Sequence, residues 1–190
     1  GPDGLHVAAH CAGTSARAVT ARKGSFMQRY SGGVYWPLDP RMNEVALIDI
    51  AHSLSMQCRF TGHARTFYSV AEHSVHVSHC VPEELALVAL LHDATEAYVT
   101  DVASPVKRHL ENYADLEALN WAVIAEKFDL PRQLPEEVHV ADQAMLMRER
   151  EVLLPTVPGL SAAAWYGAES APAPANRQIF CWTPAEAKQQ

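Results

Sequence analysis

The stretch "EELALVALLHDATEAYVTD" (83–101) constrains the fold of this chain more than any other, because an apolar run ends there in ionisable residues. Its first half reads as a largely buried helix. His92 and Asp93 stand at the end of that helix, and Glu96 and Asp101 follow shortly after. A charge buried in an apolar environment is costly unless it has a partner. These four residues therefore either pair with one another or surround a cation.

Helical periodicity recurs along most of the chain, which predicts an all-α fold of five or more helices with at most a small β ribbon. Two helix starts carry capping residues, namely Asn43 before a helix from about Glu44 to Cys58, and a Ser69–Glu72 capping box before a helix from about Val70. Further helices are expected at 113–128 and 136–153, short strands at 33–36 and 177–182, and loops at 100–107 and 170–176.

The composition fits one globular domain. The 190 residues are 48% hydrophobic and 19% charged, enough apolar side chains for a substantial core. We expect residues 27–190 to form this domain. Residues 1–26 are weakly patterned, so we expect an N-terminal extension there, either derived from a tag or flexible. The net charge of −7 argues against a nucleic-acid polymer as partner, because such binding normally uses a basic face.

Cysteine usage and hydropathy indicate a location. The four cysteines are scattered without a CxxC pair, which is typical of a reducing compartment and of neither a zinc ribbon nor a disulfide framework. The sequence has no apolar run long enough to cross a membrane, and no continuous apolar region of a signal peptide. We therefore expect a cytoplasmic protein without a membrane partner.

Three predicted helical segments each carry residue types that bind metals. "VAEHS" supplies His73, "LLHDATE" supplies His92 and Asp93, and "HVADQAM" supplies Asp142 among apolar neighbours. Two imidazoles and two carboxylates suit one divalent ion such as Mn, Co, Fe, Zn, Ni or Mg. Adjacent residues lie about 100° apart around a helix, so His92 and Asp93 converge only where the helix ends or bends.

Other residues near these segments suit hydrolysis. Glu96 could accept a proton from an attacking water, and near a cation its pKa should be lowered, so that it is ionised at neutral pH. Asp101 could hold that water or receive the proton of the leaving group. Arg59, Arg65 and Lys107 could neutralise phosphate charge.

Several of these residue types more often have purely structural roles. A lone histidine is usually a core or surface residue, and we expect this for His76, His79, His109 and His139. Glu72 has a structural role as partner in the capping box. Phe60 is more often a core or turn aromatic than a platform for a base.

The order of these motifs resembles the HD-domain metal-dependent phosphohydrolases, and most of all bacterial 5′-deoxynucleotidases and phage dATP triphosphohydrolases. The resemblance spans about residues 45–150 and rests on Arg59-Phe60, "VAEHS", "LLHDATE", "TDVASPVK" and "VAD". It implies an HD-type helical bundle. It implies roles for nine residues: metal ligands His73, His92, Asp93 and Asp142, catalytic Glu96 and Asp101, and substrate contacts Arg59, Phe60 and Lys107.

The expected function is a 5′-nucleotidase that removes phosphate from deoxynucleoside monophosphates with one divalent metal ion. One alternative is a dNTP triphosphohydrolase of the dATP type, since the same ligands serve both reactions. Another, of a different class, is a non-catalytic HD sensor that binds a nucleotide. Phe60 stands where the resembling enzymes often carry Trp, so the preference for base and sugar stays open, as does a homo-oligomeric state.

Overall fold

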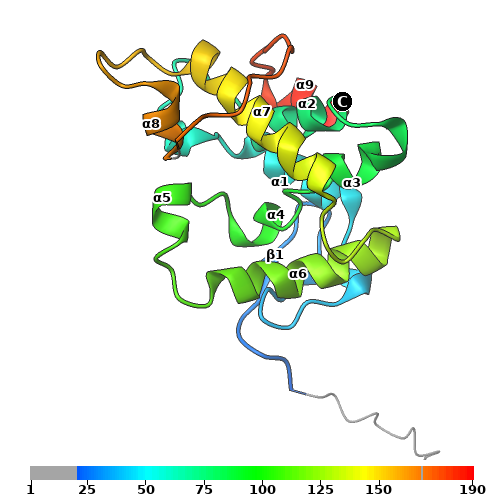
Figure 1. Cartoon of the computed structure of the whole chain (residues 1–190). Coiled ribbons are helices and arrows are strands. Elements are labelled where there is room, and N and C mark those ends of the chain that lie inside the picture. The colour runs from blue at the N-terminus through cyan, green and yellow to red at the C-terminus, as the bar shows by residue number, and fades with distance from the viewer. Residues whose placement is uncertain (1–20, 168) are drawn as a thin grey trace, which may run out of the picture.

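A computed structural model describes residues 21–167 and 169–190, and its fold is all-α with one small β ribbon, as the sequence predicts (Figure 1). The ribbon pairs β1 (Met27–Gln28) with β2 (Val34–Tyr35) in antiparallel register. Gly32 and Gly33 between them have φ of 87° and 86°, a left-handed conformation that glycine adopts readily. The strand predicted at 33–36 is therefore confirmed.

The predicted extension 1–26 lies mostly outside the described residues, which begin at residue 21. Within the described part, Arg22 forms ion pairs of 2.6 Å with both Asp39 and Glu44. Glu44 ends the short 3-10 helix η1 (Met42–Glu44). These contacts fix residue 22 against the segment that leads into the first α-helix.

The first two α-helices differ from the sequence prediction at their N-termini. Helix α1 (Leu47–Met56) starts after Ala46 without a side-chain cap, so the expected cap at Asn43 is wrong. Helix α2 (Val70–Ser78) starts as predicted, and the Ser69 hydroxyl accepts the backbone N–H of Glu72 at 3.0 Å. The Glu72 carboxylate does not complete the capping box, because it binds the distant segment 180–182 instead.

The helix predicted at 83–93 is broken at its functional end. The 3-10 helix η3 (Glu83–Leu85) leads into α3 (Ala86–Leu90), residues 91–95 form turns, and α4 (Glu96–Val99) follows. The helix end that two adjacent ligands require is therefore confirmed. The backbone of this bend carries both His92 and Asp93.

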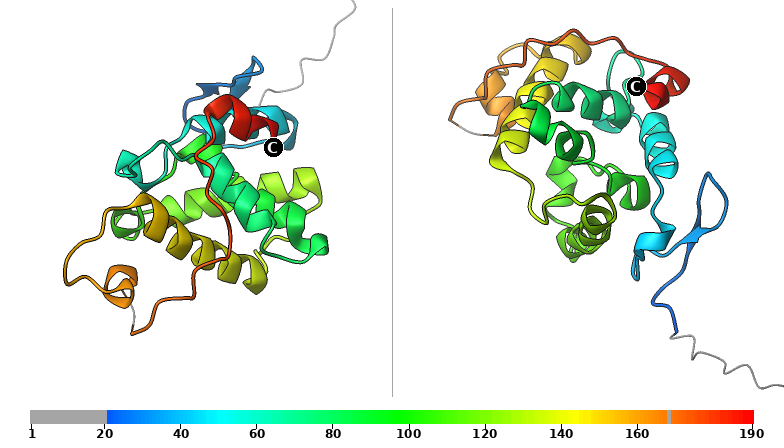
Figure 2. Two further views of the ribbon diagram at one scale, coloured as in Figure 1. Left: turned by 90° about the horizontal axis from the view of Figure 1, so that it is seen from above. Right: turned by 90° about the vertical axis from the view of Figure 1, so that its right-hand side faces the viewer.

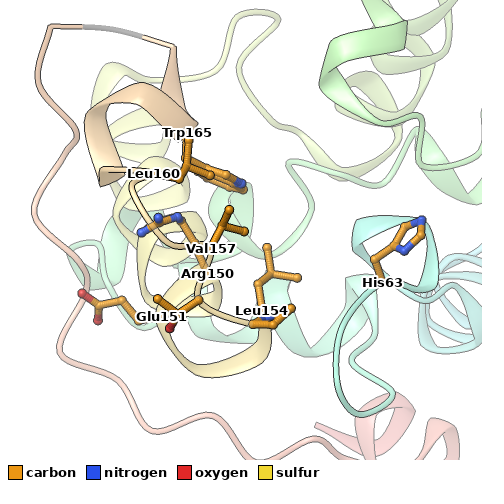
Figure 3. Close-up of a pocket in the computed structure, with 9 residues that line it drawn as sticks. His63, Arg150, Glu151, Leu154, Val157, Leu160 and Trp165 are labelled. Carbon is orange, nitrogen blue, oxygen red and sulfur yellow. The ribbon is translucent and has the colours of Figure 1, made fainter.

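The second half of the chain contains the two longest helices of the described part. Helix α6 (Tyr113–Phe128) and helix α7 (Glu136–Leu153) have the predicted bounds. The segment 100–107, predicted as a loop, contains the short helix α5 (Ser104–Lys107). Helix α8 (Ala162–Tyr166) was not predicted; it follows the C-terminal end of α7 and borders a recess there (Figure 3).

The C-terminal segment crosses the molecule as an extended strap before its last helix (Figure 2). The strand predicted at 177–182 is wrong, since these residues form no ladder with any described strand. The Glu72 carboxylate accepts the backbone N–H groups of Phe180, Cys181 and Trp182 at 2.6–2.9 Å. Helix α9 (Pro184–Gln189) follows, with a Thr183–Glu186 capping box that the sequence analysis overlooked.

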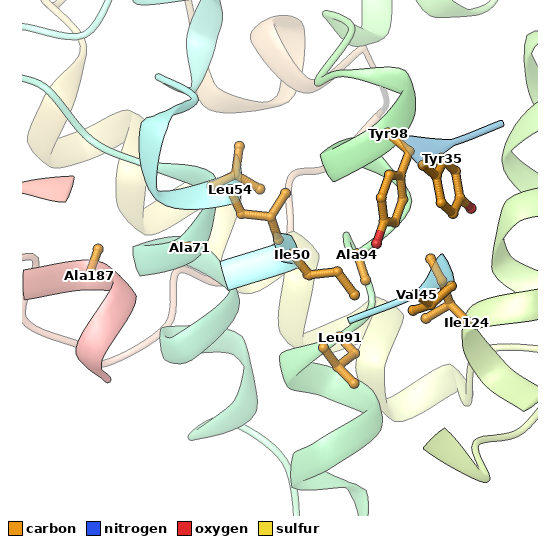
Figure 4. Close-up of a cluster of buried hydrophobic side chains, with 11 residues drawn as sticks. Tyr35, Val45, Ile50, Leu54, Ala71, Leu91, Ala94, Tyr98, Ile124 and Ala187 are labelled. Atoms are coloured by element: carbon orange, nitrogen blue, oxygen red, sulfur yellow. The ribbon is translucent and has the colours of Figure 1, made fainter. Parts of the chain in front are cut away.

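Two hydrophobic clusters form the core, and Figure 4 shows the larger one. The larger one joins α1, α2, α4, α6 and α9 around Ile50, Leu54, Ile124 and Ala187. The smaller one packs α3 against α7 through Val88 and Met145, among others. Within 21–167 and 169–190, no helix combines the length and the apolar composition needed to span a bilayer.

Candidate metal centre and active-site cleft

Three of the four predicted metal ligands converge at one point. His73 comes from the first half of α2, and His92 and Asp93 come from the bend after α3. One ligand atom from each lies within 4.8 Å of the other two. The packing of α2 against α3 therefore brings together residues that are far apart in the sequence.

The hydrogen bonds of both imidazoles direct the same nitrogen toward this point. His73 Nδ1–H donates to Glu149 Oε1 at 2.6 Å, and His92 Nδ1–H donates to the Ala89 carbonyl at 2.7 Å. Both Nε2 atoms are buried and form no hydrogen bond with any described residue. A histidine that ligates a metal typically shows this arrangement, with one ring nitrogen held by an acceptor and the other free to bind.

The fourth predicted ligand, Asp142 on α7, lies beside the three-residue group. Its Oδ1 is 3.1 Å from His73 Nε2, and its side chain is 36% exposed. The other donor separations are 3.3 Å from His92 Nε2 to Asp93 Oδ2 and 3.6 Å from His73 Nε2 to the same oxygen. Nitrogen and oxygen ligands about 2.0–2.2 Å from one ion lie roughly 3–3.5 Å from each other, and these three separations are close to that range.

The charges of the protein alone place a proton on His73. Burial and the Arg59 guanidinium lower the pKa of His73, but the carboxylates of Glu149 and Asp142 outweigh them and raise it to about 10. Burial would raise the pKa of Asp93, yet the neighbouring imidazoles and Arg59 hold that pKa far below its usual range. Because a ligating imidazole must be deprotonated, a divalent ion would displace the His73 proton.

Glu149 is the buried residue that organises this cluster, and the sequence analysis did not identify it. Besides His73, it accepts hydrogen bonds from Tyr68 Oη at 2.9 Å and Arg59 Nε at 3.1 Å. Its spacing from Asp142 is about two helical turns on α7, so both carboxylates lie on the same face. The helical spacing between Asp142 and Glu149 was therefore the sequence feature that could have identified Glu149.

Glu96 lies beside the ligands at the start of α4. Its Oε2 is buried and has no hydrogen-bond partner among the described residues. Burial raises the pKa of Glu96 to about 9, with further contributions from the negative charges of Asp93 and Asp101. Without a bound cation, Glu96 therefore keeps its proton at neutral pH, and the expectation that Glu96 is ionised applies to a site that holds one.

Gln57 positions the segment that contains both predicted catalytic carboxylates. Its Nε2 donates to the Glu96 carbonyl at 3.0 Å, and its Oε1 accepts the backbone N–H of Asp101 at 3.0 Å. Asp101 follows Thr100, a β-branched residue with φ of 68°. The sequence contained no pattern that singled out Gln57.

The predicted catalytic residues and substrate contacts line one cleft with a volume of about 690 Å³. Glu96, Asp101, Arg59, Phe60 and Lys107 all border it, whereas Arg65 does not. The cleft is also lined by three residues that the sequence analysis did not identify: Arg108, Trp165 and Tyr166.

The cleft contains both signs of charge. Four carboxylates line it (Asp93, Glu96, Asp101, Asp142), together with three basic residues (Arg59, Lys107, Arg108). Two of the basic groups already have anionic partners, since Arg59 binds Glu149 and Lys107 Nζ lies 2.6 Å from Glu117. Because Glu149 and Glu117 neutralise these two basic groups, the carboxylates of the cleft favour the binding of a further cation.

The fold and this cluster define a class of mostly helical proteins with a histidine–aspartate group able to bind a metal. No family model matches the chain. It is 45% identical over 129 residues to the Escherichia coli (strain K12) protein named "Uncharacterized protein YfdR", covering 68% of this chain and 72% of that protein. The chain belongs to the family of YfdR.

A second relative comes from Rhodobacter capsulatus and is named "Uncharacterized protein RCAP_rcc00048". The identity is 35% over 117 residues, which cover 56% of this chain and 60% of that protein. Neither name states an activity.

Proposed function

We propose that this protein is a metal-dependent phosphohydrolase of the HD-domain type that removes phosphate from deoxynucleoside 5′-monophosphates. One observation carries the proposal: the buried Nε2 atoms of His73 and His92 converge with the Asp93 carboxylate beside a 690 Å³ cleft. Sites for small molecules commonly have volumes of about 300–1,000 Å³, so the cleft has the right size for a nucleotide.

His73, His92, Asp93 and Asp142 would hold one divalent ion, which when bound supplies a Lewis acid for the phosphate and lowers the pKa of water. Glu96 lines the cleft, and its Oε2 has no hydrogen-bond partner among the described residues, so with a cation bound beside it Glu96 can accept a proton from an attacking water.

The remaining residues of the cleft would bind and orient the substrate. The guanidinium of Arg59 and the ammonium of Lys107 would balance the charge of the phosphate, together with Arg108. Asp101 would orient the water or receive the proton of the leaving group. Phe60 and Thr61, which line the cleft, and Thr100, which precedes the lining residue Asp101, all have positive φ, and strained backbone of this kind tends to occur at functional sites.

The test is a screen of deoxynucleoside mono- and triphosphates with Mn²⁺, Co²⁺, Mg²⁺ or Zn²⁺, with the products separated by chromatography. Orthophosphate from a monophosphate is the expected product. Inorganic triphosphate would show a dNTP triphosphohydrolase instead, and nucleotide binding without any product would show a sensor.

Two variants make this screen specific for the cluster. Asp93→Asn should lose bound metal by elemental analysis and lose turnover with it, because a charged ligand is removed. Asp115→Asn, an exposed carboxylate in the first turn of α6, should keep both. Full metal content in Asp93→Asn would contradict the proposed ligand set.

The cytoplasm is the location that we propose. Cys58, Cys80 and Cys181 are free thiols, and thiols stay reduced in that compartment.

A further inference from the structure

The cleft contains an aromatic region that the proposed chemistry does not use. Trp165 and Tyr166 of α8 line it together with Leu146 and Leu154. Trp165 and Leu154 also line a separate recess of about 410 Å³, whereas none of the four predicted metal ligands does (Figure 3). The indole therefore lies where the cleft meets this recess, on the side away from the metal ligands.

Trp165 is held in place before any ligand arrives. The Arg150 guanidinium of α7 lies over its ring, 5.3 Å from the centroid, and Arg150 lines the recess but not the cleft. Helix α8 is capped at its start, where the Ser161 hydroxyl accepts the Ala164 N–H at 3.1 Å, and Gly167 ends it at φ of 79°. An aromatic ring fixed in this way loses little conformational entropy when a ligand stacks on it.

We infer that Trp165 stacks against the base of the substrate while the phosphate lies at the Asp93–Glu96 end of the cleft. The inference rests on the proposed function, and it defines the substrate class as nucleotides that retain a base rather than sugar phosphates. Stacking of a base on an aromatic side chain tolerates different bases, because every base has a π-face. Trp165 should thus contribute affinity for nucleotides in general.

A purely structural role for Trp165 makes a different prediction, and the chain supplies a matched control for it. Trp36 is also half-buried with an arginine over its ring, since Arg22 lies 5.0 Å from that centroid. Trp36 does not line the cleft. If the arginine–tryptophan pair only stabilises the local fold, removal of either indole should have the same kind of effect on stability and on nucleotide binding.

The experiment measures binding by calorimetry, in full-length protein that carries Glu96→Gln so that a substrate is not consumed. The two probes are dAMP and 2-deoxyribose 5-phosphate, each with Mn²⁺. Trp165→Ala should weaken dAMP binding by about 5- to 100-fold, the range measured for base–aromatic stacking, and leave binding of 2-deoxyribose 5-phosphate unchanged. Trp165→Phe should keep most of the affinity, and Trp36→Ala should keep all of it.

The inference is overturned if Trp165→Ala binds dAMP as tightly as its parent, if both probes weaken equally, or if the parent does not bind dAMP. The loss of affinity in Trp165→Ala supports the inference only if Trp165→Phe, which retains a ring, binds dAMP well and both variants have the circular dichroism spectrum of their parent.

Turnover by the wild-type chain is scored separately. Release of orthophosphate with unchanged binding in Trp165→Ala would refute the stacking role and leave the proposed function standing. Selective loss of dAMP binding in Trp165→Ala, without any turnover by the wild type, would support the stacking role and refute the proposed function.

Discussion

Glu96 is a buried carboxyl group whose environment opposes its ionisation. Its pKa is about 9 in the folded protein against 4.5 as the ordinary value, so between these pH values the folded state binds more protons than the unfolded state. The stability of the metal-free wild type must therefore fall as pH rises through this window. A neutral side chain of the same shape would not titrate.

Glu96→Gln should for this reason stabilise the metal-free protein at pH 8, by roughly 1–3 kcal/mol, with the difference vanishing near pH 4. In the same variant turnover should fall by roughly 100-fold or more, the scale of a positioned acid–base group. Urea unfolding in a chelator at several pH values and turnover with metal check the two parts. A stability difference independent of pH would show that the carboxyl does not titrate in this window.

Glu149 accepts hydrogen bonds from three buried or nearly buried side chains and has no exposed surface. Glu149→Gln should destabilise the protein by about 2–4 kcal/mol, because the nearly buried Arg59 then loses its shorter ion pair and keeps only the 3.6 Å pair with Asp93. Metal affinity should fall by roughly 10- to 100-fold, as is usual when the acceptor behind a ligating imidazole is changed. Chemical unfolding and metal titration measure these effects.

Glu151→Gln is the matched control on the same helix. Glu151 is half-exposed, and among residues 21–167 and 169–190 its one ion pair is the i,i+3 pair of 3.5 Å with Arg148. Loss of this ion pair should change stability by less than about 0.5 kcal/mol and leave metal affinity unchanged. Equal effects of the two substitutions would remove the special role of Glu149.

Single residues divide clearly into those that the sequence could identify and those that it could not. His73, His92 and Asp93 belong to short motifs, and the structure brings them together. Gln57 is linked to the site by hydrogen bonds across 39 and 44 positions, and Trp165 reaches the cleft from α8, so no local spacing indicated them. Asp142 has the position that its motif predicts, but it lies beside the three-residue group rather than within it.

At the scale of elements, α2 depends on the strap that crosses it. The Glu72 carboxylate accepts three successive backbone N–H groups, and the neighbouring His76 ring lies against Phe180 and Trp182 at centroid distances of 5.8 and 5.6 Å. His76, for which the sequence analysis expected a structural role, is fully buried here. These contacts attach the strap to the helix that carries His73.

Glu72→Gln should release the strap, because an amide has only one oxygen to accept hydrogen bonds where the carboxylate has two. We expect a loss of about 2–4 kcal/mol in stability and faster hydrogen exchange at residues 180–182. Glu186→Gln, at the exposed capping box of α9, should cost less than about 1 kcal/mol and leave that exchange nearly unchanged. Unchanged exchange in Glu72→Gln would contradict this role.

Helices were predictable where periodicity and length agreed, as for α6 and α7. The missed elements are short: α5, α8 and α9 have four to six residues each. Helices of this length are set by caps and tertiary contacts rather than by periodicity. The aromatic and apolar residues of 177–182 suggested a strand, but three of their backbone N–H groups bind a side chain on α2, and the described part of the chain has no strand beside them with which to pair.

For the whole molecule, the candidate metal ligands connect segments that pack in both hydrophobic clusters. Helix α2 contributes to each cluster, and α7 contributes Asp142 as well as core residues. A ligand that binds only the folded state at 100 times its Kd adds about 2.7 kcal/mol, which corresponds to a rise in Tm of roughly 5–10 °C for a chain of this size. Chelator-treated wild type should show this rise with Mn²⁺ or Zn²⁺ in calorimetry.

The same titration with Asp93→Asn should show little or no rise in Tm. A rise equal to that of the wild type would place the stabilising ion elsewhere on the molecule. Asp115→Asn should behave like the wild type, because its side chain is exposed on α6 and belongs to no part of the cluster.

The strap also has a consequence for the order of events during synthesis. Glu72 and its partners are separated by 108–110 positions along the chain. Ribosomes add about 5–20 residues per second, so α2 would wait roughly 5–20 s before the residues that cover it exist. During that interval the carboxylate of Glu72 has none of its three donors. Completion of the helix that presents His73 is therefore one of the last steps in the maturation of a newly made molecule.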